Sequence, residues 1–194
     1  MKYVKMLGLA AVAAMALMAF AGTASATVLT SPSGTALPAG TEIVASAESS
    51  LLLRAGFANI TCTESNVVGK TENAGGAGET VRGPIGTLTF SSCNATVHVL
   101  KKGSLEVHAV GSGPNGTLIS TGAEATVSTA GISCTYGTLN THIGTLTGSS
   151  TTGGDATLHI EAKLNKTAGG FLCASPAAWE GNYIVTSPTP LDVS

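Results

Sequence analysis

The chain has 194 residues, a formal net charge of −2 and only 10% charged residues, whereas about a quarter is usual in globular proteins. So few Lys and Arg residues argue against a nucleic-acid-binding surface, because neutralising phosphates requires clustered cations. Apolar residues make up 43% of the chain, which is more than a disordered protein carries. We therefore expect a folded protein whose surface is made mainly of Thr, Ser and Gly.

The N-terminal segment, residues 1–26, has the pattern of a cleavable secretory signal peptide. Two lysines precede an uncharged, mostly apolar stretch over residues 6–21, and Ala24 and Ala26 stand at the two small positions before a cleavage site. A membrane-spanning helix would need about 20 apolar residues, which this stretch does not reach, and no later run is apolar enough to span a bilayer. The sequence predicts that residues 1–26 are removed and that residues 27–194 are secreted.

Strand patterns dominate the rest of the chain. An extended lead-in at residues 27–41 holds several turn signals with Ser, Pro and Gly. The short segments that follow alternate apolar and polar residues as half-buried strands do; in one of them Leu105, Val107 and Ala109 share a face. We expect strands at residues 42–47, 57–63, 65–71, 85–91, 95–101, 104–110, 116–121, 123–128, 131–136, 143–147, 155–163 and 181–186.

Three segments have a different local pattern. Residues 48–55 fit either one turn of helix or a buried strand, because three leucines follow one another there. Asn115-Gly116 lies between two strand-like runs, which is a strong signal for a hairpin turn. Residues 73–78 are rich in Gly and Ala and are expected to form a flexible loop.

Many short strands separated by Gly-containing turns are typical of an antiparallel β-sandwich or a jelly roll. A β-solenoid would need a more regular repeat than this chain has. We therefore expect one all-β domain over residues 27–194, built as an antiparallel sandwich or in a jelly-roll-like arrangement.

The cysteines indicate two disulfides, because an even number in an exported chain is usually paired. No C-x-x-C motif is present, so a zinc site or a thioredoxin-like redox site is disfavoured. Three pairings are open, and we favour Cys62–Cys93 with Cys134–Cys173. The reason is a weak internal similarity, in which residues 60–63 resemble residues 132–135, so that each half would hold its own bridge.

No cluster of reactive side chains stands out, so we predict no catalytic residue, no metal site and no cofactor. His98 and His108 would share a metal only if they faced each other across a hairpin, and no carboxylate cluster completes such a site. The chain has two Asp residues and no G-x-S-x-G motif, which disfavours a serine hydrolase. Both histidines are expected to lie on solvated strand faces.

A glycoside hydrolase would need a pair of carboxylates in a cleft. Glu106, Glu124, Glu161 and Glu180 are the candidates, but a catalytic acid also needs a pocket that raises its pKa. Glu106 and Glu161 alternate with apolar residues and should face water. Aromatic residues that would line a sugar cleft are only 4% of the chain.

The single tryptophan, Trp179, and the nearby Tyr183 form the candidate ligand surface. Trp179 follows two alanines and lies near Cys173, which favours a place in the core beside that bridge. A binding platform for a ligand is the alternative.

The motifs at residues 60–65, 87–93 and 171–173, together with Trp179 and Tyr183, give a family resemblance. The chain resembles a family of small exported, disulfide-containing all-β proteins of unknown function from high-GC Gram-positive bacteria. The resemblance covers most of the mature chain and its motifs are structural. It implies export and two bridges, and it brings no functional residue.

We expect a secreted or envelope-associated, non-enzymatic protein with a binding or surface-structural role. This expectation rests on the absence of a reactive cluster and on the uncharged, hydroxyl-rich surface. The expected partners are an envelope polysaccharide or further copies of the same chain, and not a nucleic acid. A secreted glycan-active hydrolase and a self-assembling surface or matrix subunit stay open as alternatives, the latter requiring an exposed sheet edge.

Overall fold

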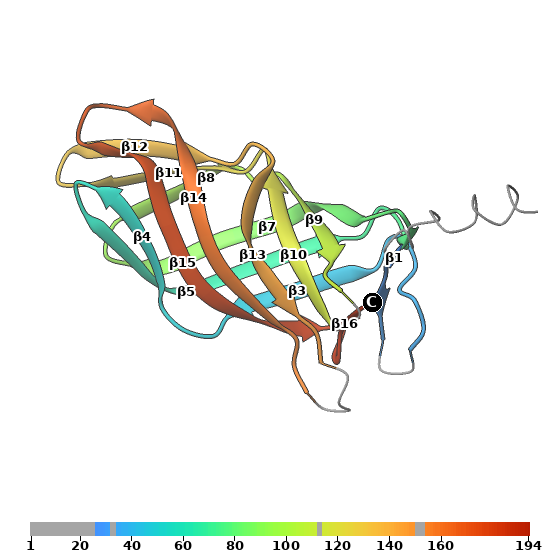
Figure 1. The fold of residues 1–194 in the computed structure, drawn as a ribbon. Helices are drawn as coiled ribbons and strands as arrows, with labels where there is room; N and C mark the ends of the chain where they lie inside the picture. The colour runs from blue at the N-terminus through green and yellow to red at the C-terminus, as the bar shows by residue number, and fades with distance from the viewer. Residues whose placement is uncertain (1–25, 32–33, 112–113, 150–153) are drawn as a thin grey trace, which may run out of the picture.

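The computed structural model describes residues 26–31, 34–111, 114–149 and 154–194. Residues 1–25 of the expected signal peptide therefore lie outside the described residues. All the elements in the described part of the chain are strands (Figure 1). Accordingly, that part contains no helix with the length and apolar character needed to cross a membrane.

Twelve strands form one antiparallel sheet. In pairing order they are β3 (Glu42–Ala47), β15 (Cys173–Ser187), β4 (Leu51–Gly56), β5 (Asn59–Lys70), β7 (Val81–Cys93), β9 (Ser104–Ala109), β10 (Asn115–Thr121), β13 (Thr141–Thr147), β14 (Thr157–Gly169), β12 (Ile132–Gly137), β11 (Glu124–Thr129) and β8 (Thr96–Lys101). Two short pairs accompany this sheet. They join β1 (Ala26–Thr27) to β6 (Gly76–Ala77), and β2 (Leu29–Thr30) to β16 (Asp192–Val193).

The large sheet folds back on itself, because two of its strands pair with additional neighbours. Strand β3 pairs with β5 as well as with β15, and β14 pairs with β15 as well as with β12 and β13. The curved layers face each other and enclose one interior, so the fold is all-β and sandwich-like, as the sequence predicts.

The molecule has two halves that share four long strands. β5, β7, β14 and β15 run along its length (Figure 1). The short strands β9, β10 and β13 complete one half, and β8, β11 and β12 complete the other. Each short strand of one half is joined by a turn to a short strand of the other, so the wall bends where the halves meet.

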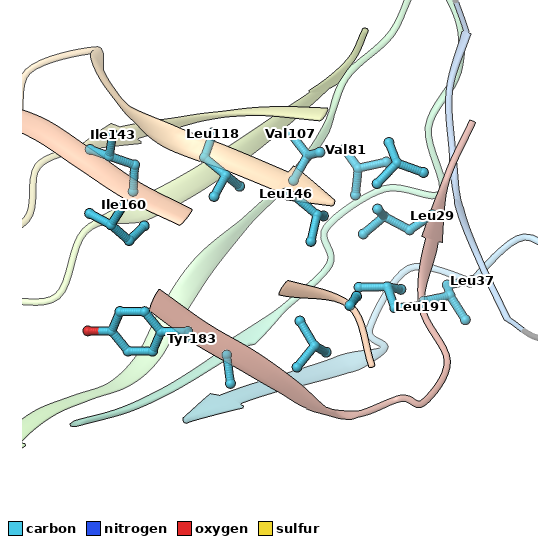
Figure 2. Close-up of a cluster of buried hydrophobic side chains, with 14 of the residues drawn as sticks. Leu29, Leu37, Val81, Val107, Leu118, Ile143, Leu146, Ile160, Tyr183 and Leu191 are labelled. Atoms are coloured by element: carbon cyan, nitrogen blue, oxygen red, sulfur yellow. The ribbon is translucent and has the colours of Figure 1, made fainter. Parts of the chain in front are cut away.

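Each half has its own apolar core. Figure 2 shows the larger core, in which Leu118 and Leu146 are directed into the same interior as Tyr183 of β15. The smaller core contains both disulfides and is built around Val127 and Tyr136. Phe90 and Leu164 pack against both cores and so connect them.

Both disulfides have the favoured pairing. Cys62 and Cys93 lie directly opposite each other on β5 and β7, and Cys134 of β12 is bonded to Cys173 of β15. The internal similarity that suggested the pairing does not correspond to a structural repeat, however. Residues 60–63 lie on β5, which pairs with β7, the strand of its disulfide partner. Residues 132–135 lie on β12, which pairs with β11 and β14 and not with β15, the strand of Cys173.

The expected turn at Asn115-Gly116 is wrong in position. The hairpin between β9 and β10 exists, but its turn precedes Asn115. At the base of this turn the Val110 amide donates to the Asn115 carbonyl at 2.8 Å. A side chain at Gly116 would bring a Cβ atom within 2.9 Å of Val107 Cγ1. This glycine is therefore required by packing inside the strand, and not by a turn.

Residues 51–56 form strand β4, which is the buried-strand alternative expected for that segment. Two other expectations are revised by the pairing of the strands. The strands expected at residues 57–63 and 65–71 are one continuous strand, β5, over Asn59–Lys70. The expected loop at residues 73–78 includes β6, which pairs with β1. In both cases a neighbouring strand, β7 for β5 and β1 for β6, supplies partners for backbone groups that a loop would leave to water.

Candidate apolar binding cavity

A cavity of about 130 Å³ lies where the two cores meet. Its wall is apolar and comes from both halves, with Leu53 from β4, Leu88 and Phe90 from β7, Val97 from β8 and Leu158 from β14. An apolar void of about 150 Å³ in another protein stays dry and binds benzene. This cavity is therefore of a size and polarity that suit a small apolar molecule.

A second cavity of about 90 Å³ adjoins the first. Both are lined by Val67, Ile85, Leu105, Leu118 and Leu158. The second extends away from the junction toward the core of Figure 2, where Leu146 and Leu191 contribute to its wall. The two cavities thus follow each other along an elongated apolar interior.

The sequence explains why this interior is incompletely filled. Eight strands close into a ring, namely β3, β5, β7, β9, β10, β13, β14 and β15. A ring of about eight strands leaves an interior that side chains only just fill, or that holds one small ligand. Here the inward positions carry mostly Leu, Ile, Val and Ala, and aromatic residues are only 4% of the chain.

Most polar atoms in the cavity wall are already hydrogen-bonded to the protein. Tyr183 donates from its hydroxyl to Ser65 Oγ at 3.0 Å, and Tyr136 donates to the Ala55 carbonyl at 2.8 Å. Such groups are costly to bury without a partner. Because these are satisfied, the wall that they complete behaves as apolar toward a ligand.

Glu124 is the one acidic residue in the wall of the first cavity. Its carboxylate lies 2.9 Å from Lys101 Nζ and accepts the Thr167 hydroxyl at 2.8 Å. Hydrogen bonds from Lys101 and then from Thr167 hold the pKa of Glu124 below its ordinary value. Its carboxylate is therefore ionised at neutral pH, at the bend between β10 and β11.

The first cavity also reaches a seam between β7 and β8. These strands follow each other in the chain, but over residues 86–101, all of which the structure describes, they form no ladder. Just beyond the end of β8, the Ile85 amide of β7 donates to the Gly103 carbonyl at 2.9 Å. Leu88 and Phe90 line the cavity on one side of this seam and Val97 on the other, so the seam borders the cavity on both sides.

Trp179 and Tyr183, the expected ligand surface, both lie in the wall of the first cavity. Tyr183 is 1% exposed and has no outer surface to offer. Trp179 packs edge-on against Phe90, with ring centroids 6.2 Å apart. The structure brings the two residues together at an interior site and not on the outside of the sheet.

The other candidate residues are not gathered into a site. Among the described residues no three His, Cys, Asp or Glu side chains come together as metal ligands would. Glu106 accepts the Thr80 hydroxyl and lies 3.3 Å from His108 Nε2. His98 is exposed on β8, which does not pair with the strand of His108.

The arrangement needed for glycoside hydrolysis is not built from these carboxylates. Glu161 lies opposite Glu180 on β14 and β15, on a solvated face of the sheet. A hydrogen bond from Arg54 holds the pKa of Glu180 below its ordinary value, whereas a general acid needs a raised pKa. Glu124, the one of them in a cavity wall, has Lys101 as its neighbour.

The buried Tyr183 predicts a loss of stability at alkaline pH. Burial raises its pKa from an ordinary value of 10.0 to about 12. The unfolded chain ionises first, so the stabilisation is fully present below pH 10 and is lost as the pH rises from 10 to 12, by about 3 kcal/mol. Urea unfolding at pH 9 and pH 12 measures this loss, and Tyr183→Phe should reduce it. An equal loss in the variant would contradict the assignment.

Sequence reasoning found the two aromatic residues but missed the aliphatic ones that form most of the wall. Leu88, Leu118 and Leu158 lie in the alternating apolar and polar pattern of any half-buried strand. Nothing in the local sequence distinguishes a residue that lines a cavity from one that is packed in the core. The low aromatic content was the one available signal that the interior is underfilled. No family model, curated protein or solved structure matches this chain, so the interior cavity itself is what indicates a function.

Proposed function

We propose that this protein is an exported, non-enzymatic binding protein that holds a small apolar molecule in the first cavity. The observation that carries the proposal is the apolar void of about 130 Å³ where the two cores meet. Moving a ligand's apolar surface out of water contributes about 25 cal/mol per Å². The cavity walls are already apolar, so a ligand gains this energy without displacing bonded polar groups.

The rigidity of the wall supports the same proposal. A preformed pocket binds more tightly than one that must be ordered on binding. Here strand ladders hold the long strands on both sides, and two disulfides link β5 to β7 and β12 to β15. Among the described strands, β7 and β8 are neighbours along the chain without a ladder, and the seam between them borders the first cavity.

Export is part of the proposal and is supported by the two disulfides, since such bridges persist in oxidising compartments. Association with an envelope polysaccharide or with a second copy stays a prediction. Strand β8 ends the sheet order, so its outer edge is of the kind that self-assembly needs. Lys101 and Lys102 at its end are charges of the kind that discourage edge pairing.

The test uses the single Trp179 as a reporter, because its ring lines the cavity. The oxidised, exported protein is titrated with butylbenzene, and Trp179 emission and the heat of binding are followed. We expect saturable 1:1 binding with a negative heat-capacity change, the mark of apolar burial.

Leu158→Trp should weaken this binding at least tenfold, because Leu158 lines both cavities and a larger ring would fill them. The matched control is Leu100→Trp, at a side chain that is 55% exposed and outside both cavities. Heat of binding reports on both variants, since each carries a second Trp. Absence of saturable binding to the unaltered protein would overturn the proposal, as would equal binding in a folded Leu158→Trp variant.

A further inference from the structure

We infer that the ligand is a neutral, unbranched aliphatic molecule with one oxygen acceptor near its end, whose oxygen lies at Ser120 and Thr138 and whose tail extends into the second cavity. This inference rests on the proposed function and names the ligand class of the same site. Three features carry it: the shape of the interior, an unused donor in its wall, and the charge of Glu124.

The shape of the interior favours a chain over a ring. The two cavities share five aliphatic lining residues and lie end to end, with about 130 Å³ in the first and about 90 Å³ in the second. A compact ring as large as the two volumes together would have to displace the shared side chains. A flexible alkyl chain can pass from one cavity into the next between Leu105, Leu118 and Leu158.

The wall of the first cavity contains one hydroxyl pair that is not fully used. Ser120 Oγ and Thr138 Oγ1 are 3.0 Å apart and both residues are buried, at 3% and 9% exposure. Thr138 Oγ1 also accepts the Ala123 amide at 3.0 Å. Two hydroxyl hydrogens are thus present and one bond joins the pair, whichever oxygen donates.

The second hydroxyl hydrogen has no acceptor among the described residues. A buried donor of this kind favours a ligand that brings an acceptor. Both residues line the first cavity and neither lines the second. The ligand oxygen therefore belongs in the first cavity, and the second accommodates an apolar tail. The polar residues in the wall of the second cavity include Lys70 and Thr71, which are paired with Glu42 and with the Pro38 carbonyl.

Glu124 makes a neutral ligand preferable to an anionic one. Glu124 is in the same wall, at the bend that Ser120 and Thr138 also border, and its carboxylate is paired with Lys101 at 2.9 Å. A ligand carboxylate near the hydroxyl pair would bring a second negative charge beside Glu124. Like charges in a partly buried site repel one another, and no Lys or Arg among the described residues lines this cavity.

The hydroxyl pair also has a structural role, which the test must distinguish from a role in binding the ligand. Thr138 holds the bends between the halves, since its amide donates to Ala123 and its carbonyl accepts from Gly122, each at 2.9 Å. These backbone bonds persist when the side chain changes, whereas the bond from the Ala123 amide to Thr138 Oγ1 is lost in Thr138→Val. Ser120 keeps its backbone pairing in β10 and loses only the bond between its hydroxyl and Thr138.

The experiment compares four eight-carbon probes on the unaltered protein by calorimetry at pH 7: octane, 2-octanone, octanoate and cyclooctanone. In a wall without a donor, octane would bind more tightly than 2-octanone, because the ketone would lose its hydration without compensation. We expect 2-octanone to bind at least as tightly as octane, and more tightly than octanoate and cyclooctanone. A tenfold preference for octane, or equal binding of octanoate, would overturn the inference.

The double variant Ser120→Ala/Thr138→Val removes both hydroxyls and should weaken 2-octanone about three- to tenfold while leaving octane unchanged. The matched control is Ser128→Ala/Ser133→Ala, which removes an exposed hydroxyl pair 2.9 Å apart outside the cavity. An unchanged ratio of 2-octanone to octane affinity in the folded double variant would also overturn the inference. If butylbenzene and all four probes fail to bind, the proposed function itself is wrong. If butylbenzene binds and the four probes bind with equal affinity, the proposed function stands and only the inferred ligand class is wrong.

Discussion

The double substitution Cys134→Ala/Cys173→Ala should lower the free energy of unfolding by about 4 kcal/mol. The bridge spans 39 residues of sequence, and its loss restores the conformational freedom of that loop in the unfolded chain. Cys134 and Cys173 are 0% and 4% exposed, so removing their sulfurs also leaves a small void in the core. Urea unfolding at neutral pH measures the change.

The position of this bridge explains why its loss should matter more than that of the other. β12 and β15 form no ladder with each other and lie on either side of β14, so the bridge links strands that no backbone hydrogen bonds join. A Cβ atom at Gly169, where φ is +117°, would come within 2.5 Å of Cys173 Sγ. The absence of a side chain at Gly169, at the end of β14, therefore leaves the space that Cys173 Sγ occupies in the disulfide.

The comparison variant is Cys62→Ala/Cys93→Ala, whose bridge spans 31 residues. Chain entropy alone predicts nearly the same effect for both bridges. Because Cys62 and Cys93 join strands already paired in register, we expect the smaller loss there. A loss under about 1 kcal/mol for the Cys134–Cys173 pair would show that β12 is held by its ladders alone.

The strands most reliably predicted from the sequence are those with one solvated and one buried face. Val107 alternates with polar neighbours on β9, and its strand was predicted to within one residue. β14 and β15 extend well beyond their predicted ends, to Gly169 and back to Cys173. In these extensions the apolar residues are Ala or widely spaced, and the strands persist because other strands pair with them. Residues 165–169 of β14 pair with β12, and the extension of β15 pairs with β4 and β14.

Closure of the sheet and the cavity could not be predicted from local patterns. The pairing of β3 with β5 joins residues such as Ile43 and Gly69, and no short-range signal encodes it. Whether Leu118 meets a packed neighbour or a void depends on the distance between facing layers. That distance is set by the number and curvature of strands in the closed sheet.

Leu118→Ala should lower the free energy of unfolding by about 3–5 kcal/mol, because Leu118 is 2% exposed and its truncation adds a void to the core. Leu118 lines both cavities, so its truncation also enlarges the space where they meet. The matched control is Leu100→Ala, at a side chain that is 55% exposed, where we expect a change within about 0.5 kcal/mol.

The same variant connects core packing with binding. A ligand that binds only the folded state stabilises it by RT ln(1 + [L]/Kd), so butylbenzene should restore part of the stability that Leu118→Ala loses. The measurement is urea unfolding of both proteins with and without butylbenzene. We expect a larger stabilisation in Leu118→Ala than in the unaltered chain, because the enlarged space contacts more of the ligand. A smaller stabilisation would mean that the core collapses around the missing side chain, and that the interior is adaptable instead of preformed.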